Sequence, residues 1–398
     1  MRIARAMVAA TIAFALGLAG YWTLRLGYAD RLFQAGSDAA VERARRLAPG
    51  NAAYFAIDSA DRAALGQAVA ANPRLSSGWI ELGLLDEAAG DLAQAERRLL
   101  EAARVDRTYE PRWSLANFYF RRGERDKFWL WARQAAETAY YTQTPLFRLY
   151  WRISQEASVI LARGIPDRPN IQAQYLHFLL TEHKLDEAEP SAARFLLYST
   201  KQDVPLLALY CDRLIGAGRI ATALGVWNQL SRRGLVPHRT LEPRQGRSIT
   251  NGDFAEPPLG AGFDWRLHPV QGVTATRSDS PPELRFTFSG KQPEHCVLLE
   301  QVLPLAPGLA YRLTYSSSAS GIPAASGLRW YLADLASGKE LASASLGADS
   351  DAWHAQSLDF TAPGDAQGVR LVLEYRRATG TTRIEGTLWL RGVSTTLQ

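Results

Sequence analysis

The sequence predicts a multidomain chain that is α-helical first and β second. Three observations lead to this fold class: an uncharged run over 6–24, paired helical patterns over 38–233, and short alternating apolar runs over 249–398. We therefore expect an N-terminal transmembrane helix within 1–30, a helical solenoid over 38–233, a linker over 234–248 and an antiparallel β-sandwich over 249–398.

The composition is that of a folded protein with two or three domains. The chain has 398 residues, of which 47% are hydrophobic and 21% charged, and this argues against extended disorder. Its net charge is +5, with the positive excess confined to residues 1–248. Because this part has no Lys/Arg runs, the excess is typical of a solvated helix surface, and no nucleic-acid partner is expected.

The first segment has the features of a membrane anchor. Arg2 and Arg5 precede the uncharged run over 6–24, which is about long enough to span a bilayer core. The arginines predict a cytoplasmic N-terminus, and Trp22 suits the far interface. A cleaved signal peptide is the alternative, because residues 17–19 (GLA) offer a small-residue cleavage site. In both cases the bulk of the chain is expected outside the cytoplasm.

The helical part contains a period of 34 residues, which separates Trp79 from Trp113. Apolar or small residues follow the first tryptophan at Leu82, Gly83, Gly90, Ala95, Leu99 and Ala102. This pattern resembles the tetratricopeptide repeat, in which small residues let two helices approach closely. The match is best over 79–123 and decays into about five, mostly degenerate, helix pairs. The resemblance implies a concave surface that docks partner proteins.

The C-terminal part contains eight or nine short alternating runs separated by Gly, Pro, Ser and Asp, as expected for a sandwich. It opens with NGDF at 251–254, followed by Trp265, and also contains LPLAPGLAYRLTY at 303–315 and IEGTLWLRGVS at 384–394. These segments resemble galactose-binding-like jelly rolls, a class that includes many carbohydrate-binding modules. The resemblance implies a domain that binds glycan.

Glycan binding requires aromatic rings that stack on the apolar face of a sugar and polar side chains that bond its hydroxyls. The expected carbohydrate-binding residues are Arg329, Tyr331, Trp353 and Arg376. Alternation along a strand puts Trp330 and Tyr331 on opposite faces, so one of the two is expected in the core. Trp389 can belong to either face.

Few residues indicate a metal ion or another cofactor. Asp253 is a candidate ligand for a structural calcium ion, which the resembled modules frequently hold, while Phe254 is expected in the core. No CxxC pair or Cys/His cluster indicates zinc. Cys211 and Cys296 are expected to be free thiols, with a disulfide between domains as the alternative.

No catalytic residue is expected. The carboxylate pairs Asp253/Glu256, Glu294/Glu300 and Glu374/Glu385 are candidates for glycoside chemistry, but acidic residues on a sandwich surface are usually solvated. No histidine lies in a recognisable hydrolase motif. His295 and Cys296 suggest a dyad, although Cys296 opens an apolar strand where a reactive thiol is not expected.

Taken together, the three parts resemble bacterial envelope proteins that accompany exopolysaccharide or O-antigen polymerisation and export. The resemblance implies a non-catalytic scaffold of the inner membrane with its bulk in the periplasm. Its partners would be proteins on the solenoid, polysaccharide on the sandwich, and the membrane through residues 6–24. Two alternatives stay open: a glycan-processing enzyme with a catalytic sandwich, and a sandwich that serves only as a structural or protein-docking domain.

Overall fold

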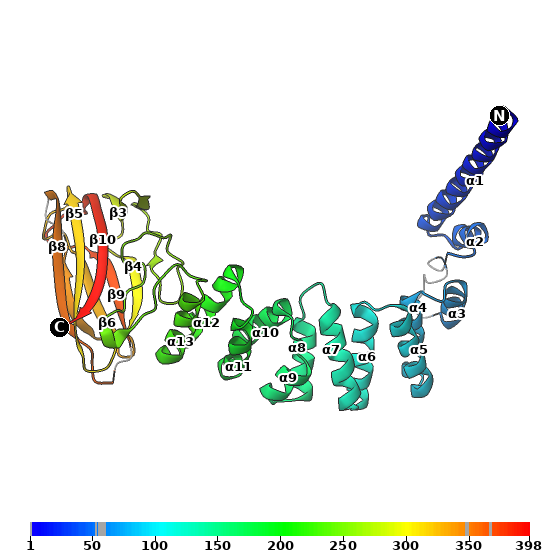
Figure 1. Ribbon diagram of the computed structural model, residues 1–398, viewed down its shortest axis with the longest axis horizontal. Coiled ribbons are helices and arrows are strands. Elements are labelled where there is room, and N and C mark those ends of the chain that lie inside the picture. Colours follow the sequence, from blue (N-terminus) through cyan, green and yellow to red (C-terminus); the bar gives the residue numbers. More distant parts are fainter. Residues whose placement is uncertain (1, 52–53, 55–60, 347–349, 366–367) are drawn as a thin grey trace. The chain divides into compact units, whose positions relative to one another are not determined.

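The computed structural model describes the chain except for residues 1, 52–53, 55–60, 347–349 and 366–367 (Figure 1). In the described part, thirteen α-helices come first and two antiparallel five-stranded sheets follow. The predicted order, α then β, is therefore confirmed. Contacts group the chain into two compact units, Met1–Tyr175 and Leu176–Gln398.

From residue 62 onward, the helices follow one another with short connections. The first unit holds α1 (Arg2–Gln34), α2 (Asp38–Leu47), α3 (Arg62–Ala71), α4 (Ser76–Ala88), α5 (Leu92–Val105), α6 (Tyr109–Arg122), α7 (Arg125–Thr138), α8 (Thr144–Ile153) and α9 (Ala157–Arg163). The unit boundary lies within α10 (Pro169–Thr181). The second unit holds α11 (Leu185–Leu196), α12 (Val204–Gly216) and α13 (Ile220–Arg232).

The best repeat match corresponds to the helix pair α4 and α5. A Cβ atom placed on Gly83 of α4 would lie only 2.8 Å from Cγ of Leu99 on α5, so a residue without a side chain is needed for this approach. Ala95, Leu99 and Ala102 are fully buried. The pairs α6/α7 and α12/α13 also pack closely. Pairing of consecutive helices, as the repeat pattern predicts, is confirmed for these three pairs.

The segment expected as a membrane anchor lies within α1. This helix exposes most of its large apolar side chains, including Phe14, Leu16 and Leu24. Its last turns are packed, where Ala29 is buried against Ala44 of α2. Within the described residues, none of the helices combines the length and the apolar character that a bilayer crossing requires.

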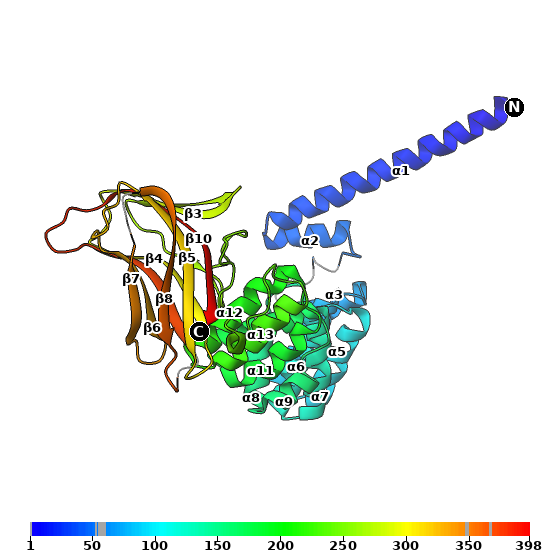
Figure 2. The same ribbon diagram turned by 60° about the vertical axis from the view of Figure 1, so that its left-hand side comes forward.

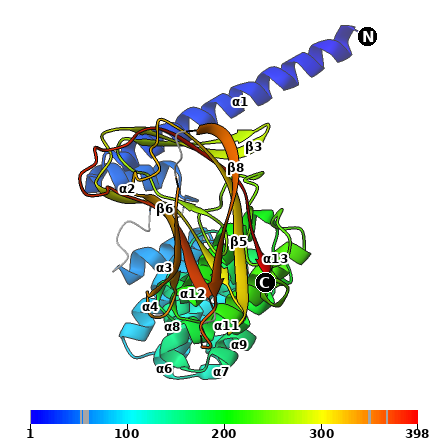
Figure 3. The ribbon, with the colours of Figure 1, turned by 90° about the vertical axis from the view of Figure 1, so that its left-hand side faces the viewer.

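The two sheets lie face to face (Figure 2). The first, called sheet I, has the strand order β1 (Arg266–Leu267), β4 (His295–Pro304), β9 (Gly368–Arg376), β6 (Leu328–Asp334) and β7 (Glu340–Ser345). The second, sheet II, has the order β2 (Val273–Asp279), β3 (Pro282–Ser289), β10 (Glu385–Leu397), β5 (Ala310–Ser320) and β8 (Ser350–Thr361). Figure 3 shows β5 and β8 on one side of the sandwich and β6 on the other.

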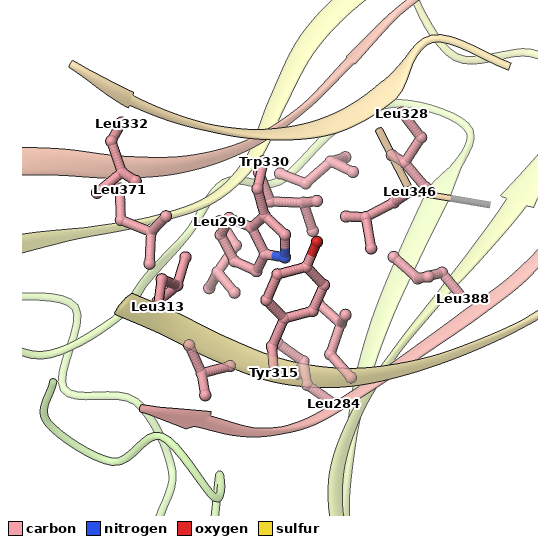
Figure 4. Packing of buried hydrophobic residues seen from close by; sticks show 14 of the residues in the cluster. Leu284, Leu299, Leu313, Tyr315, Leu328, Trp330, Leu332, Leu346, Leu371 and Leu388 are labelled. Atoms are coloured by element: carbon pink, nitrogen blue, oxygen red, sulfur yellow. The ribbon is translucent and has the colours of Figure 1, made fainter. Parts of the chain in front are cut away.

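One apolar core fills the space between the sheets. Trp330 of β6 is fully buried, and its ring centroid lies 6.1 Å from those of Trp265 and Tyr315. Figure 4 shows Trp330 and Tyr315 pointing toward one another from opposite sheets, among leucines of both. Burial alternates along β6, so that Trp330 faces the core and Tyr331 does not. Of the two neighbouring aromatic residues, Trp330 is therefore the one that belongs to the core.

The stretch that opens the sandwich is a hydrogen-bonded loop that ends in the core. Phe254 is fully buried with its ring 5.5 Å from that of Trp265. The indole Nε1 of Trp265 donates to the carbonyl of Asn251 at 2.9 Å. The Asn251 side chain in turn exchanges two hydrogen bonds with the backbone of Glu256. Asp253 lies in an exposed turn. The prediction that Phe254 faces the core is confirmed.

The last helix pair packs directly against the sandwich within the second unit. Asp212 of α12 accepts a hydrogen bond from the backbone N–H of Gly262 at 2.8 Å and pairs with Arg266. Trp227 of α13 is fully buried, 6.1 Å from the Phe263 ring. A Cβ on Gly262, whose φ is +61°, would lie 2.4 Å from the Trp227 ring. Glycine is therefore needed at this contact.

The segment over 234–248, which has the composition of a linker, is packed in the structure. Val236 and Leu241 are buried. The Asn228 side chain donates to the carbonyl of Leu241 and accepts from its N–H, at 2.9 and 2.8 Å. The 3₁₀ turn Pro243–Gln245 is closed by the bridge between Glu242 and Arg247. These contacts fix the connection between α13 and the sandwich.

Candidate functional site

Alternation in β6 and β9 creates a polar surface on the outside of sheet I. On β6, Arg329 and Tyr331 point away from the core, and they pair with Glu374 and Val372 of β9. At the end of β9, Arg376 pairs with His295 of β4. We call the cluster formed by His295, Arg329, Tyr331, Glu340, Glu374 and Arg376 the Glu374 surface. It contains three of the four predicted carbohydrate-binding residues.

Glu374 lies at the centre of this surface. Its side chain is only 2% exposed, although it points away from the core. Arg329 Nε donates to Oε1 at 2.8 Å, and His295 Nε2 lies 2.9 Å from Oε2. The guanidinium of Arg376 is 3.8 Å away. A buried carboxylate is tolerated only when its charge is paired and its oxygens are hydrogen-bonded, and these neighbours meet both conditions.

Arg329 is held in place from three directions. Besides Glu374, its Nη1 lies 3.0 Å from both carboxylate oxygens of Glu340. Its guanidinium carbon lies 5.0 Å from the ring centroid of Tyr331, within the range of cation–π attraction. Arg376, by contrast, has a side chain that is 62% exposed. The surface thus combines a fixed Arg–Tyr stack with one arginine that is accessible to solvent.

The pKa of Glu374 is lowered despite its burial. Desolvation alone raises this pKa, but hydrogen bonds from His295 and Arg329, and the charges of Arg329 and Arg376, outweigh it. Glu374 is therefore ionised at neutral pH. A general acid of a glycosidase needs the opposite displacement, a raised pKa, so Glu374 is not suited to that role.

The lowered pKa predicts an acid-sensitive contribution to stability. Because the folded-state pKa lies below the unfolded value of about 4.3, the stabilisation is complete above that value and is lost as the pH falls through the folded-state pKa. Glu374→Gln should therefore lower the free energy of unfolding by about 1–3 kcal/mol at pH 7 and flatten its pH dependence below pH 5 or so. Denaturant titrations at several pH values measure this. The control is Glu385→Gln on sheet II, and an unchanged acid slope in Glu374→Gln would contradict the assignment.

Trp353, the fourth predicted residue, lies on the other side of the sandwich. It belongs to β8 of sheet II, and the guanidinium carbon of Arg391 on β10 lies 3.8 Å from its ring centroid. The structure thus brings Arg329, Tyr331 and Arg376 together and separates Trp353 from them. Trp389, whose face the sequence left open, points outward on sheet II and is half-buried.

The calcium candidate Asp253 has few neighbouring ligands. Its Oδ1 accepts from the N–H of Ala255 at 3.3 Å, and it lines a pocket of about 590 Å³ together with His238 and Thr250. Across the residues that the structure describes, no group of three or more His, Cys, Asp or Glu side chains is placed to hold a metal ion. A calcium ion bound by Asp253 stays a prediction.

The other reactive residues are dispersed. Glu374 and Glu385 lie on different sheets, whereas Glu294 pairs with Arg377 at 3.0 Å. Cys211 and Cys296 are both free thiols. Burial raises the pKa of each thiol, which makes them poor nucleophiles at neutral pH. The structure therefore separates the carboxylates of Glu374 and Glu385, and it places both thiols where burial disfavours the thiolate.

Two residues of these surfaces were missed by sequence reasoning. Glu340 binds Arg329 from the neighbouring strand β7, and Arg391 stacks on Trp353 across β5. Alternation in LWLRG already places Arg391 on the same face as Trp389. No sequence signal identifies Glu340, because its role depends on which strand lies beside β6.

The fold and these surfaces define a class: a chain of paired helices that ends in a two-sheet antiparallel sandwich. No family model matches the chain, and no curated protein matches it. Among solved structures, one described as "CBM4 structure and function" is 16% identical and covers 38% of this chain and 100% of its own, with a TM-score of 0.30.

Two further similarities concern different kinds of protein. PilF of Pseudomonas aeruginosa is 15% identical over 54% of this chain and 90% of its own, with a TM-score of 0.22. A cyclase from Fischerella sp. TAU, in complex with 4-(1H-indol-3-yl)butan-2-one, is 18% identical over 38% of this chain and 97% of its own, with a TM-score of 0.24. In three more matches the chain spans only 21%, 26% and 28% of a longer protein. Identities and TM-scores this low do not indicate a shared function.

Proposed function

We propose that the protein is a non-catalytic scaffold whose sandwich binds glycan and whose helix pairs dock partner proteins. The observation that carries the glycan part is the Glu374 surface, where Arg329, Tyr331 and Arg376 meet on one face. A sugar presents an apolar ring face and hydroxyls that both donate and accept hydrogen bonds. Tyr331 supplies a ring, Arg376 supplies donors and Glu340 supplies acceptors.

The rigidity of the surface supports binding. Arg329 is fixed by two carboxylates and one ring, so ordering it around a ligand costs little conformational entropy. Positive and negative groups alternate across the surface, as shown by the pairs of Arg329 with Glu340 and with Glu374. This mixture suits a hydroxyl-rich ligand better than a highly charged polymer.

A binding experiment with the full chain tests the proposal. Tyr331→Ala and Arg376→Ala should each weaken binding to immobilised oligosaccharides about 3- to 10-fold, as expected for loss of a stacking or charged contact. Tyr331→Phe, which keeps the ring, is the matched control. Unaltered affinity in both alanine variants, with unchanged thermal unfolding, would show that this surface is not the site.

The direction in which the pKa values of the carboxyl groups are displaced supports the non-catalytic part of the proposal. Among the described carboxyls with a clearly displaced pKa, each is displaced downward: Glu96, Glu101, Asp106, Glu124, Asp334, Asp359 and Glu374. A glycosidase needs one carboxyl whose pKa is raised. Prolonged incubation of the bound oligosaccharides with the protein provides the test, since release of shorter products would favour the enzyme alternative.

Protein docking by the helical part rests on a fold-level analogy with other helical repeats.

Membrane attachment through residues 6–24 of α1 is proposed from the uncharged run and the exposed side chains of Phe14, Leu16 and Leu24. Together with the resemblance to envelope proteins, this supports a location at the bacterial inner membrane, facing the periplasm, and a role in exopolysaccharide assembly or export. Extraction that needs detergent supports the anchor, whereas a mature N-terminus near residue 20 supports a cleaved signal.

A further inference from the structure

The outer face of sheet II is lined by hydroxyl side chains. Because strand register is known, the residues that share this face can be followed from strand to strand. Its serines and threonines are Thr274, Thr276, Ser278, Thr287, Ser289, Thr314, Ser316, Ser318, Ser320, Ser357, Thr387, Ser394 and Thr396. A 2.8 Å hydrogen bond between the hydroxyls of Thr314 and Ser394 confirms that neighbouring strands present them side by side.

Two tryptophan side chains lie on this hydroxyl-lined face. Trp389 of β10 is paired with Ser318 of β5, and Trp353 belongs to β8 on the other side of β5. The strands that carry the two indoles are therefore about 10 Å apart, two inter-strand spacings. Both side chains are half-buried, so each keeps part of its ring accessible. We call Trp353, Trp389, Arg391 and the hydroxyl residues around them the Trp353 surface.

Arg391 completes the arrangement next to Trp353. Its guanidinium carbon lies 3.8 Å from the Trp353 ring centroid, which fixes the side chain by cation–π attraction. The five N–H donors of a guanidinium thus lie over one face of the Trp353 ring. The pair offers a sugar fixed donors and the uncovered part of one indole, and Trp389 adds a second ring that is partly accessible.

The charged side chains of this face nearly balance. The described outward residues of sheet II include three arginines, which are Arg285, Arg312 and Arg391. They also include four carboxylates, which are Glu283, Asp351, Asp359 and Glu385. Arg312 and Asp359 neutralise each other in a bidentate pair at 2.7 and 2.9 Å, and Arg285 donates to the hydroxyl of Thr276. The face is close to neutral and complements an uncharged, hydroxyl-rich polymer.

We infer that the Trp353 surface is a second glycan-binding site, specific for neutral polysaccharide, so that the sandwich binds glycan on both of its outer faces. The inference shares its ligand class with the proposed function but rests on a different sheet and on different residues. Apolar sugar faces stack on the two indoles, and sugar hydroxyls exchange hydrogen bonds with the Ser and Thr side chains. A module with sites on opposite faces holds two polysaccharide chains at once.

Affinity electrophoresis of the full chain in gels that contain dextran, galactomannan or xylan tests the inference. The variant Trp353→Ala/Trp389→Ala should bind these neutral polysaccharides about tenfold more weakly, since two stacking contacts are lost. The matched control Trp353→Phe/Trp389→Phe keeps two rings and should retain most of the affinity. Light scattering provides a second readout: the unaltered protein should cross-link soluble polysaccharide into larger particles, and the double alanine variant should not.

The outcomes separate this inference from the proposed function. If the double alanine variant keeps its affinity and its cross-linking while Tyr331→Ala/Arg376→Ala loses binding, the Trp353 surface is not a site and the Glu374 surface stands. If instead the double alanine variant loses binding while Tyr331→Ala/Arg376→Ala keeps it, the Trp353 surface is a glycan-binding site and the Glu374 surface is not. If neither variant weakens binding, or the unaltered protein binds no polysaccharide, both are overturned. Thermal unfolding of each variant shows that loss of binding does not reflect loss of the fold.

Discussion

Replacing Trp330 with alanine is expected to lower the free energy of unfolding of the second unit by about 3–5 kcal/mol, the usual cost of deleting a buried aromatic. Trp330 is fully buried at the centre of the sandwich, with Trp265 and Tyr315 each 6.1 Å away. Removal of the indole leaves a cavity that the two sheets cannot close without moving. Denaturant unfolding followed by the β-sheet signal in circular dichroism measures the loss.

The neighbouring residue on the same strand is the matched control. Tyr331 faces outward and is half-buried, so Tyr331→Ala should cost less than about 1.5 kcal/mol. A similar cost for both substitutions would contradict the assignment of Trp330 to the core and of Tyr331 to the Glu374 surface.

Trp227→Ala is expected to destabilise the second unit by about 3–5 kcal/mol as well, although this residue lies on a helix. Its indole is fully buried against Phe263 and Gly262, where α13 meets the sandwich. We expect the helical and the β signals of the second unit to unfold together in the unaltered protein and to separate in the variant. Unfolding followed at one wavelength for helix and another for strand tests this.

Tyr198→Ala, which truncates a side chain that is 50% exposed after α11, is the control for that experiment and should change stability by less than about 1 kcal/mol. If Trp227→Ala leaves the midpoint of the β transition unchanged, the helices contribute nothing to the stability of the sandwich.

Much of the fold can be predicted from the sequence because its signals are local. Gly83 and Leu99 lie 16 positions apart in one helix pair. The spacing of this small and this large residue is enough to predict that the two helices pack closely. Alternation in LRWYLAD likewise separates Trp330 from Tyr331. The connection over 234–248 is different: Pro, Gly and Arg give it the composition of a linker, yet Leu241 is fixed by the side chain of Asn228, a contact that composition does not reveal.

The candidate site could be predicted only in part, because it depends on strand order. Arg329 meets Glu374, 45 residues further on, because β6 lies beside β9 in sheet I. Trp353 looks equally suitable in the sequence, but β8 belongs to sheet II. Alternation within a strand tells which side chains share a face of that strand. It does not tell which strands share a sheet, since this is decided by contacts between distant segments.

The distribution of tryptophans in the second unit has an optical consequence. Trp227, Trp265 and Trp330 are fully buried, whereas Trp353 and Trp389 are partly open to water on sheet II. Indoles in water emit at longer wavelengths than indoles in apolar surroundings, so the two groups contribute different parts of the fluorescence spectrum. A polymer that settles on sheet II should shift the red-edge emission toward the blue, while unfolding should shift the remaining emission toward the red. The second unit therefore carries separate intrinsic reporters of occupancy and of folding, and neither requires a label.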